Sequence, residues 1–138
     1  MSLPIRQVVP KENAMLAASA VTWFEIPTAN LDRATRFYED VLGIKLKPDA
    51  MGPMKFSIFP VDKGQPTGCI MQAEGYRPSA DSTTVYLNLR DDLAKPLGKV
   101  EKAGGKVLQG KTALPENMGF YAQFLDSEGN RVGFFSPQ

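Results

Sequence analysis

Hydrophobic and polar residues alternate where the regular part of the chain begins, and this alternation is typical of a strand. The segment Val-Thr-Trp-Phe-Glu-Ile from Val21 is rich in β-branched and aromatic residues and ends at Pro27. Apolar positions then return every three or four residues, which predicts a helix over 31–42. Asn30 is a favoured N-cap, and Gly43 supplies the left-handed residue that ends a helix. Proline and glycine divide the rest of this half into three predicted strands: 44–47, 54–61 and 68–72.

The same order of elements is predicted a second time. A strand over 83–89 leads to a helix over 93–103, which has Asp92 as its cap and ends at Gly104-Gly105. Pro96 removes an early hydrogen bond of this helix, so we expect the helix to start late or irregularly. Asp126 to Asn130 has the composition of a hairpin turn. The strands predicted in this half are 106–109, 118–125 and 131–135.

An internal repeat is therefore the main organisational feature of the chain. Met-Lys-Phe-Ser-Ile-Phe-Pro-Val-Asp at 54–62 matches Met-Gly-Phe-Tyr-Ala-Gln-Phe-Leu-Asp at 118–126, 64 residues later. We predict an N-terminal arm over 1–19 and a single domain over 20–138. The domain consists of one βαβββ module over 20–73, a linker over 74–82 and a second βαβββ module over 83–137.

Composition and charge exclude several classes of function. The chain is 43% hydrophobic and 22% charged, which is ordinary for a soluble protein. Its net charge is only +1 and its basic residues are not clustered, so we expect no nucleic-acid partner. No segment approaches the roughly 18 apolar residues of a membrane span, so we expect no membrane partner. The apolar run before Ala20 is too short for a signal peptide, and we expect a cytoplasmic protein.

The chain contains no histidine and one cysteine, Cys69. Without imidazole there is no Ser-His-Asp or Cys-His catalysis and no metal site that includes His. With one cysteine there is no intrachain disulfide, and we expect Cys69 to behave as a small buried hydrophobic residue rather than as an activated thiolate.

Three motifs occur in order along the repeat: Asn-Leu-x-Arg-Ala-x-x-Phe-Tyr-x-x-Val-Leu-Gly at 30–43, Lys-Val-x-x-Ala-Gly-Gly-Lys-Val at 99–107 and Asp-Ser-Glu-Gly-Asn-Arg-Val-Gly at 126–133. Together with the repeat they resemble the vicinal oxygen chelate superfamily, which contains glyoxalase I, bleomycin-resistance proteins, fosfomycin-resistance enzymes and extradiol dioxygenases. The resemblance implies an α+β fold in which two tandem βαβββ modules form strongly curved mixed sheets with the helices on their outer face.

The resemblance also implies where a metal ion would be bound. Catalytic members carry four His, Gln or Glu ligands on the first and fourth strands of the two modules, and these point into a cup. The corresponding positions in this chain are Trp23, then Cys69 or Met71, then Thr84 and finally Gly133. Trp, Thr and Gly do not bind such an ion, and a lone Cys or Met does not make a site. We therefore expect no metal ion and no cofactor.

Strand alternation predicts what lines the cup instead. Phe24, Ile26, Val85 and Leu87 are the apolar partners for the helices, so the residues between them face the other way. Aromatic and sulfur-containing walls around a carboxylate and an amide suit a flat or apolar molecule with a polar or cationic group. The predicted ligand-binding residues are Trp23, Glu25, Cys69, Met71, Thr84, Tyr86, Asn88 and Phe135.

Each of the central residues also has an ordinary structural explanation. Glu25 lies among apolar neighbours, so it is either a desolvated carboxylate that acts as an acid or base, or a strand-edge residue paired with Arg or Lys. Trp23 and Tyr86 either stack on a ligand or belong to the core or an interface. Arg33 and Arg36 are expected to form local ion pairs on a solvated helix face with Asp32, Glu39 and Asp40.

Three functions follow from this reasoning. The first is a metal-independent protein that binds an aromatic or hydrophobic small molecule in a cup. The second is a glyoxalase-like lyase or another enzyme that uses Glu25 without the usual metal ligands, and the third is a protein-interaction module. A homodimer is expected as well, because open curved sheets leave edges and a concave face that a second copy can cover.

Overall fold

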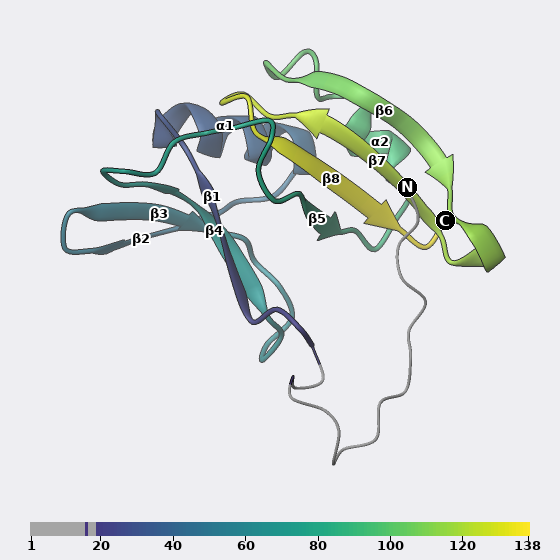
Figure 1. Ribbon diagram of the computed structural model, residues 1–138, viewed down its shortest axis with the longest axis horizontal. Helices are drawn as coiled ribbons and strands as arrows, with labels where there is room; N and C mark the ends of the chain where they lie inside the picture. Colours follow the sequence, from purple (N-terminus) through teal and green to yellow (C-terminus); the bar gives the residue numbers. More distant parts are fainter. Residues whose placement is uncertain (1–15, 17–18) are drawn as a thin grey trace.

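The computed structural model describes residue 16 and residues 19–138. It contains two four-stranded mixed sheets, each built from one half of the repeat (Figure 1). The sheets are open rather than closed into a barrel, and the two helices lie behind them. The fold class expected from the sequence is confirmed: α+β, with two tandem βαβββ modules. Most of the predicted N-terminal arm lies outside the described residues.

The first module has the strand order β1-β4-β3-β2, in which β1 runs parallel to β4 and the other pairs are antiparallel. The hydrophobic face of helix α1 packs on β3 and β4. The elements of this module are β1 (Trp23–Pro27), α1 (Leu31–Leu42), β2 (Lys47–Met51), β3 (Met54–Ile58) and β4 (Thr67–Gln72).

The second module repeats this arrangement as β5-β8-β7-β6, again with one parallel pair, β5 with β8. Both first strands, β1 and β5, therefore lie at the edge of their sheets. The elements of this module are β5 (Val85–Asn88), α2 (Ala94–Leu97), β6 (Lys106–Ala113), a 3-10 turn (Pro115–Asn117), β7 (Phe120–Leu125) and β8 (Arg131–Ser136).

The helix predicted over 31–42 is confirmed at both ends. The Asn30 side chain accepts a hydrogen bond from the amide of Arg33 at 3.0 Å, which satisfies one of the free donors of the first turn. Gly43 ends the helix in the left-handed conformation, with φ of 67°.

The second helix is shorter than predicted. Only Ala94–Leu97 is α-helical, whereas the pattern predicted a helix over 93–103. Pro96 has no amide hydrogen, and the chain beyond it continues in tighter turns, in which the amide of Lys99 donates to the carbonyl of Pro96 at 3.0 Å. The segment nevertheless packs on the core, because Leu93 and Val100 are both 0% exposed.

Several predicted strand bounds were also wrong. The strand predicted over 54–61 ends at Ile58, and the strand predicted over 83–89 covers only Val85–Asn88. The strand predicted over 44–47 begins only at Lys47, because the preceding residues wrap around the end of α1, where the amide of Leu46 donates to Glu39 at 2.9 Å. The strand predicted over 106–109 extends to Ala113, and its pairing with β7 shifts register twice.

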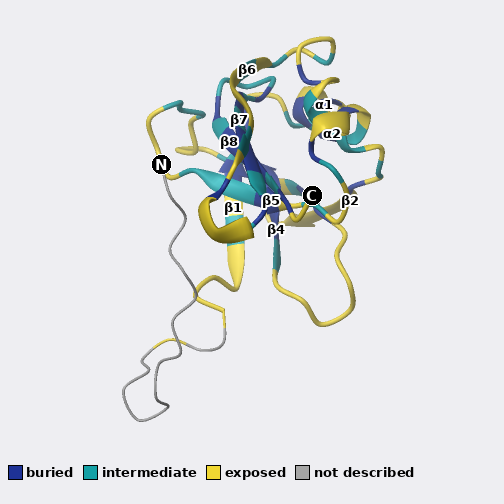
Figure 2. Cartoon of the chain, turned by 90° about the vertical axis from the view of Figure 1, so that its right-hand side faces the viewer, coloured by how far each residue is buried: buried dark blue, intermediate teal, exposed yellow. Residues whose placement is uncertain are grey.

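One hydrophobic core joins the modules. The ring of Phe37 on α1 lies 6.1 Å from the ring of Phe124 on β7, and the buried residues form a single cluster drawn from both halves of the chain. Burial is concentrated on the inner strands, while the hairpins are exposed (Figure 2). No helix among the described residues has the length and hydrophobicity needed to cross a membrane.

Candidate functional site: a cavity between the two modules

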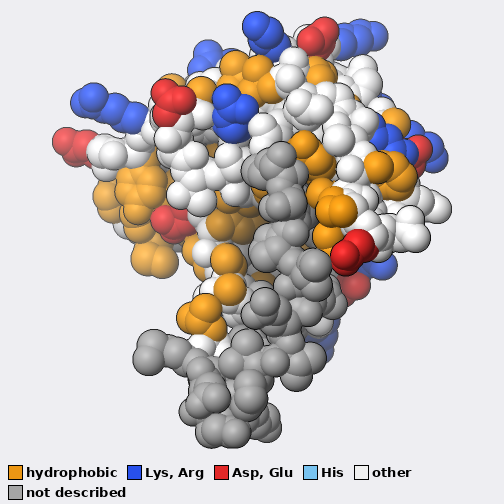
Figure 3. Space-filling model, turned by 45° about the vertical axis from the view of Figure 1, so that its right-hand side comes forward, with side chains coloured by type: hydrophobic (Ala, Val, Ile, Leu, Met, Phe, Trp, Pro, Cys, Tyr) orange, Lys and Arg blue, Asp and Glu red, His pale blue; other side chains and the backbone are white. Residues whose placement is uncertain are grey.

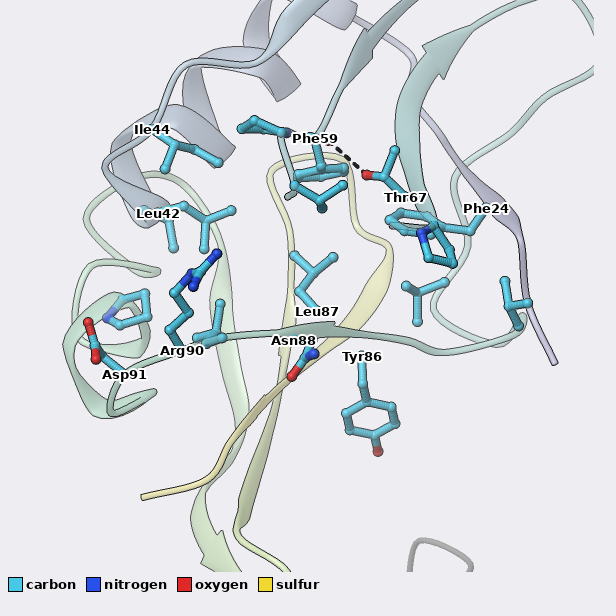
Figure 4. A pocket seen from close by; sticks show the side chains of 18 of the residues that line it. Phe24, Leu42, Ile44, Phe59, Thr67, Tyr86, Leu87, Asn88, Arg90 and Asp91 are labelled. Carbon is cyan, nitrogen blue, oxygen red and sulfur yellow. Dashed lines mark hydrogen bonds between the residues drawn. The ribbon is translucent and has the colours of Figure 1, made fainter. Parts of the chain in front are cut away.

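A cavity of about 970 Å³ opens between the edge strands β1 and β5. Its walls come from both modules: from β1 and the end of α1 on one side, and from β5 and α2 on the other. The deep part is apolar, and Figure 4 shows Leu42, Ile44, Phe59 and Leu87 around it. A cleft of this size with mostly apolar walls is typical of small-molecule sites.

Four of the eight predicted ligand-binding residues line this cavity: Trp23, Thr84, Tyr86 and Asn88. The alternation predicted for β5 is visible in Figure 4, where Leu87 lies on one side of the strand and Tyr86 and Asn88 lie on the other. Trp23 is 40% exposed, so its ring is accessible at the edge of β1.

Glu25 lies elsewhere, in a second cavity of about 370 Å³ that it lines together with Arg77 and Arg131. It is exposed rather than desolvated, contrary to one of the two explanations considered for it. Its carboxylate accepts hydrogen bonds from Trp23 Nε1 and from the Tyr76 hydroxyl, each at 3.3 Å. The nearby carboxylate raises the pKa of Tyr76. Glu25 therefore orients two exposed aromatic side chains.

The other three predicted residues line neither cavity. Cys69 and Met71 are each 1% exposed, because the central strand β4 is flanked by β1 and β3. Burial, with a smaller contribution from Glu25, raises the pKa of the Cys69 thiol to about 12, so the thiol is not ionised at neutral pH. Phe135 is half-buried near the C-terminal end of β8, where its ring lies close to Gly119.

Gly133 shows why a metal ligand has no room at its position. A Cβ atom at Gly133 would lie 2.3 Å from the ring of Tyr86, which therefore occupies the space of any side chain there. The Tyr86 hydroxyl accepts a hydrogen bond from Gln123 Nε2 at 2.6 Å, and Gln123 in turn accepts one from Arg131 at 3.0 Å. Within the described part of the chain, no group of three His, Cys, Asp or Glu residues could hold a metal ion. The donor set does not fit the metal that the resemblance implies.

A polar clamp joins the two modules: the turn between β7 and β8 contacts the start of α1. Glu128, in the turn between β7 and β8, accepts hydrogen bonds from the amides of Ala29 and Asn30 at 3.0 Å, and the Arg33 guanidinium donates to both of its oxygens at 2.7 and 2.9 Å. Its side chain is 0% exposed. Burial alone would raise the pKa of Glu128, but the hydrogen bonds, led by that of Arg33, lower it. The prediction that Arg33 forms a local ion pair was wrong.

The same turn also contacts the core of the first module, through a hydrogen bond between Asp126 and Tyr38. The buried Tyr38 hydroxyl donates to Asp126 Oδ2 at 2.7 Å, and the amide of Asn130 donates to Oδ1 at 2.9 Å. Burial and the neighbouring carboxylate raise the pKa of Tyr38 well above its usual value, and burial raises the pKa of Asp126 despite its hydrogen bonds. The hairpin predicted over 126–130 is confirmed, with Gly129 at a φ of 88°. Its role as a clamp was not foreseen, although a buried tyrosine hydroxyl needs a partner.

A family model, Glyoxalase/Bleomycin resistance protein/Dioxygenase superfamily, matches residues 20–134. The chain belongs to the glyoxalase/bleomycin resistance protein/dioxygenase superfamily. The resemblance seen in the motifs is thereby confirmed, and the match covers both modules.

Individual relatives support the same assignment. A glyoxylase-like domain-containing protein of Didymella fabae is 31% identical over 121 residues, covering 84% of this chain and 92% of that protein. The structure of a family enzyme from Burkholderia phytofirmans PsJN aligns with a TM-score of 0.62 at 14% identity, covering 85% of this chain and 98% of that one. Glyoxalase I from Zea mays aligns with a TM-score of 0.59 at 21% identity and covers 84% of this chain. This superfamily member spans only 45% of the maize chain, and the structural similarities concern the fold alone.

Proposed function

We propose that this chain binds a small aromatic or hydrophobic molecule in the cavity between β1 and β5. The observation that carries the proposal is the cavity itself, about 970 Å³ in volume, with a deep apolar wall and an accessible tryptophan at its edge. Burying apolar ligand surface contributes roughly 25 cal/mol for each Å². A cleft between two modules that share a core can supply such burial without a large rearrangement.

We propose further that binding does not need a metal ion or a cofactor. Trp23 and Thr84 are poor ligands, Cys69 is buried as a thiol, and Tyr86 fills the space above Gly133. Elemental analysis after dialysis against zinc, nickel, iron and manganese tests this point. About one tightly bound ion per chain would contradict it.

An enzyme of the glyoxalase-like class is the second candidate. Its support is the pair formed by the Glu25 carboxylate and the Tyr76 hydroxyl at 3.3 Å, beside the smaller cavity. A carboxylate next to a hydroxyl can pass a proton to or from a bound substrate. This candidate requires product formation that Glu25→Gln abolishes, whereas the binding protein gives saturable binding and no product.

We also propose a cytoplasmic location, because the single cysteine is buried and unpaired and needs no oxidising compartment.

A homodimer is a further part of the proposal. Both modules leave an edge strand unpaired, and large apolar side chains are exposed: Trp23, Met51 and Val61 are 40%, 64% and 49% exposed. Light scattering should give about twice 15.1 kDa at micromolar concentration, and a mass near 15.1 kDa would contradict the dimer.

Ligand binding is tested with a thermal-shift panel of aromatic and aliphatic compounds on the wild type and two variants. Thr84→Phe places a ring inside the cavity and should abolish stabilisation by compounds that bind there. Thr22→Phe is the matched control, because Thr22 is exposed and lies outside the cavity walls. Equal stabilisation of both variants would mean that the ligand binds elsewhere.

A further inference from the structure

The charged residues that line the cavity all come from the end of β5 and the α2 segment, where they are exposed or half-exposed, and we call this side the mouth of the cavity. They are three cations, Arg90, Lys95 and Lys99, and two carboxylates, Asp91 and Asp92. Figure 4 shows the Arg90 side chain extending from the end of β5 toward Leu42, so its guanidinium borders the apolar wall. Figure 3 shows one face of the molecule, on which charged side chains of both signs are scattered without a patch of a single sign.

One of the two carboxylates is already engaged. Asp92 accepts a hydrogen bond from Lys111 Nζ at 2.8 Å and another from the amide of Ala94 at 2.9 Å. The Lys111 contact is the main reason that the pKa of Asp92 is lowered. Lys95 and Lys99 form no ion pair with any carboxylate in the described part of the chain. The mouth therefore has more positive charge than its own carboxylates balance.

Arg90 is held by a contact that a ligand can replace. Its guanidinium donates to Asp62, which lies outside the cavity walls. The two side chains are 76% and 69% exposed. Exposed ion pairs contribute little to stability, so exchanging the Asp62 carboxylate for that of a ligand costs little. The planar guanidinium can bind an incoming carboxylate through two parallel hydrogen bonds.

We propose that the cavity selects amphiphilic anions, with the apolar part of the ligand against Leu42, Ile44 and Phe59 and its carboxylate on Arg90. This inference rests on the function proposed above and adds the charge of the ligand to it. The sequence pattern favoured a polar or cationic group bound by Glu25, but Glu25 lines the smaller cavity. The large cavity presents three cations against two carboxylates beside an apolar wall, and one of these carboxylates is already paired with Lys111.

The single tryptophan of the chain makes the test direct, because Trp23 lines the cavity and its fluorescence reports occupancy. The probes are decanoate, 1-decanol and decyltrimethylammonium, which share one apolar chain and differ in charge, at concentrations below micelle formation. Decanoate should bind most tightly and the cation least. Arg90→Gln should weaken decanoate about three- to tenfold and leave 1-decanol unchanged.

Asp62→Asn supplies a test in the opposite direction. Removing the competing carboxylate should strengthen decanoate binding about two- to fivefold without affecting 1-decanol. Lys102→Gln is the control for net charge, since Lys102 is exposed and lies outside the cavity walls, and it should bind all three probes as the wild type does. Melting temperatures near the wild-type value in all three variants confirm that they are folded.

The possible failures are distinguishable. If the three probes bind equally, or if Arg90→Gln weakens decanoate and 1-decanol alike, charge selection is overturned while the cavity remains a binding site. An Asp62→Asn variant with unchanged decanoate affinity also overturns it. If no probe changes Trp23 fluorescence or the melting temperature, and the aromatic panel gives no shift either, the proposed function fails as well.

Discussion

Gly133 lies at the fourth metal-ligand position that the family resemblance implies, and the Tyr86 ring occupies the space of a side chain there. This packing can be tested quantitatively. Gly133 lies on β8 directly beneath the ring of Tyr86, its partner in the parallel β5–β8 pair. A Cβ at Gly133 would lie 2.3 Å from Cδ1 and 2.4 Å from Cε1 of that ring. The ring cannot move freely, because its hydroxyl accepts a hydrogen bond from Gln123 at 2.6 Å and its neighbour Tyr121 lies 6.3 Å away, centre to centre.

Gly133→Ala should therefore lower the free energy of unfolding by about 1 to 3 kcal/mol, which is the usual cost of overpacking. For a chain of this size the melting temperature should fall by roughly 3 to 10 °C. Gly110→Ala is the matched control, since among the described residues, its chain neighbours aside, no atom lies within 4 Å of the added Cβ, and it should stay within about 0.5 kcal/mol of the wild type. Circular dichroism measures both unfolding curves.

A double-mutant cycle identifies the cause. If the Tyr86 ring is the obstacle, Gly133→Ala should cost at least about 1 kcal/mol less in a Tyr86→Ala background than in the wild type. Unchanged stability of Gly133→Ala would show that β8 or the ring adapts freely. If Gly133→Ala lowers the free energy of unfolding as much in the Tyr86→Ala background as in the wild type, the obstacle lies elsewhere. Either result would refute the explanation of why no side chain is present at this position.

Three further outcomes are expected. Glu128→Gln should lower the free energy of unfolding by about 1 to 2 kcal/mol at pH 7. Because the pKa of Glu128 is lowered in the folded state, its charge stabilises the fold above the unfolded pKa of about 4.3. The difference in free energy of unfolding between the wild type and Glu128→Gln should therefore shrink as the pH falls to 3.5. Equal differences in urea titrations at pH 7 and pH 3.5 would contradict this. Cys69, with its pKa near 12, should react with a disulfide reagent at pH 8 at least about tenfold more slowly in the folded protein than in urea, and equal rates would show that β4 is open. Tyr38→Phe should cost about 1 to 2 kcal/mol by chemical denaturation, and the exposed control Tyr76→Phe less than about 0.5; similar losses would mean that the Tyr38–Asp126 bond contributes little.

Local chemistry was enough to predict the helix over 31–42 and the alternation along β1 and β5. Each depends on residues close in sequence: Asn30 caps its own helix, Gly43 ends it, and successive strand residues point to opposite faces. The second helix is shorter than predicted. The spacing of apolar residues continues to residue 103, but Pro96 lacks an amide hydrogen and the α-helix ends at Leu97.

The site was only partly predictable, because it depends on how two modules pack. Alternation placed Trp23, Glu25, Cys69 and Met71 on one face of the sheet, but it could not show that β4 is central and buried while β1 is an edge strand. It also could not show that Glu25 lines the smaller cavity while Trp23 lines the larger one, because both cavities have walls from the two modules and form only when these pack together.

The sequence by itself determined the repeat, the family and the absence of histidine, because these are properties of residue order and composition. Tertiary structure alone decided which charges meet. Glu128 reaches Arg33 across 95 positions of the chain, and Arg90 reaches Asp62 across 28. Such contacts have no local sequence signal, because they form only when the buried apolar faces of both modules have fixed the relative position of the two sheets.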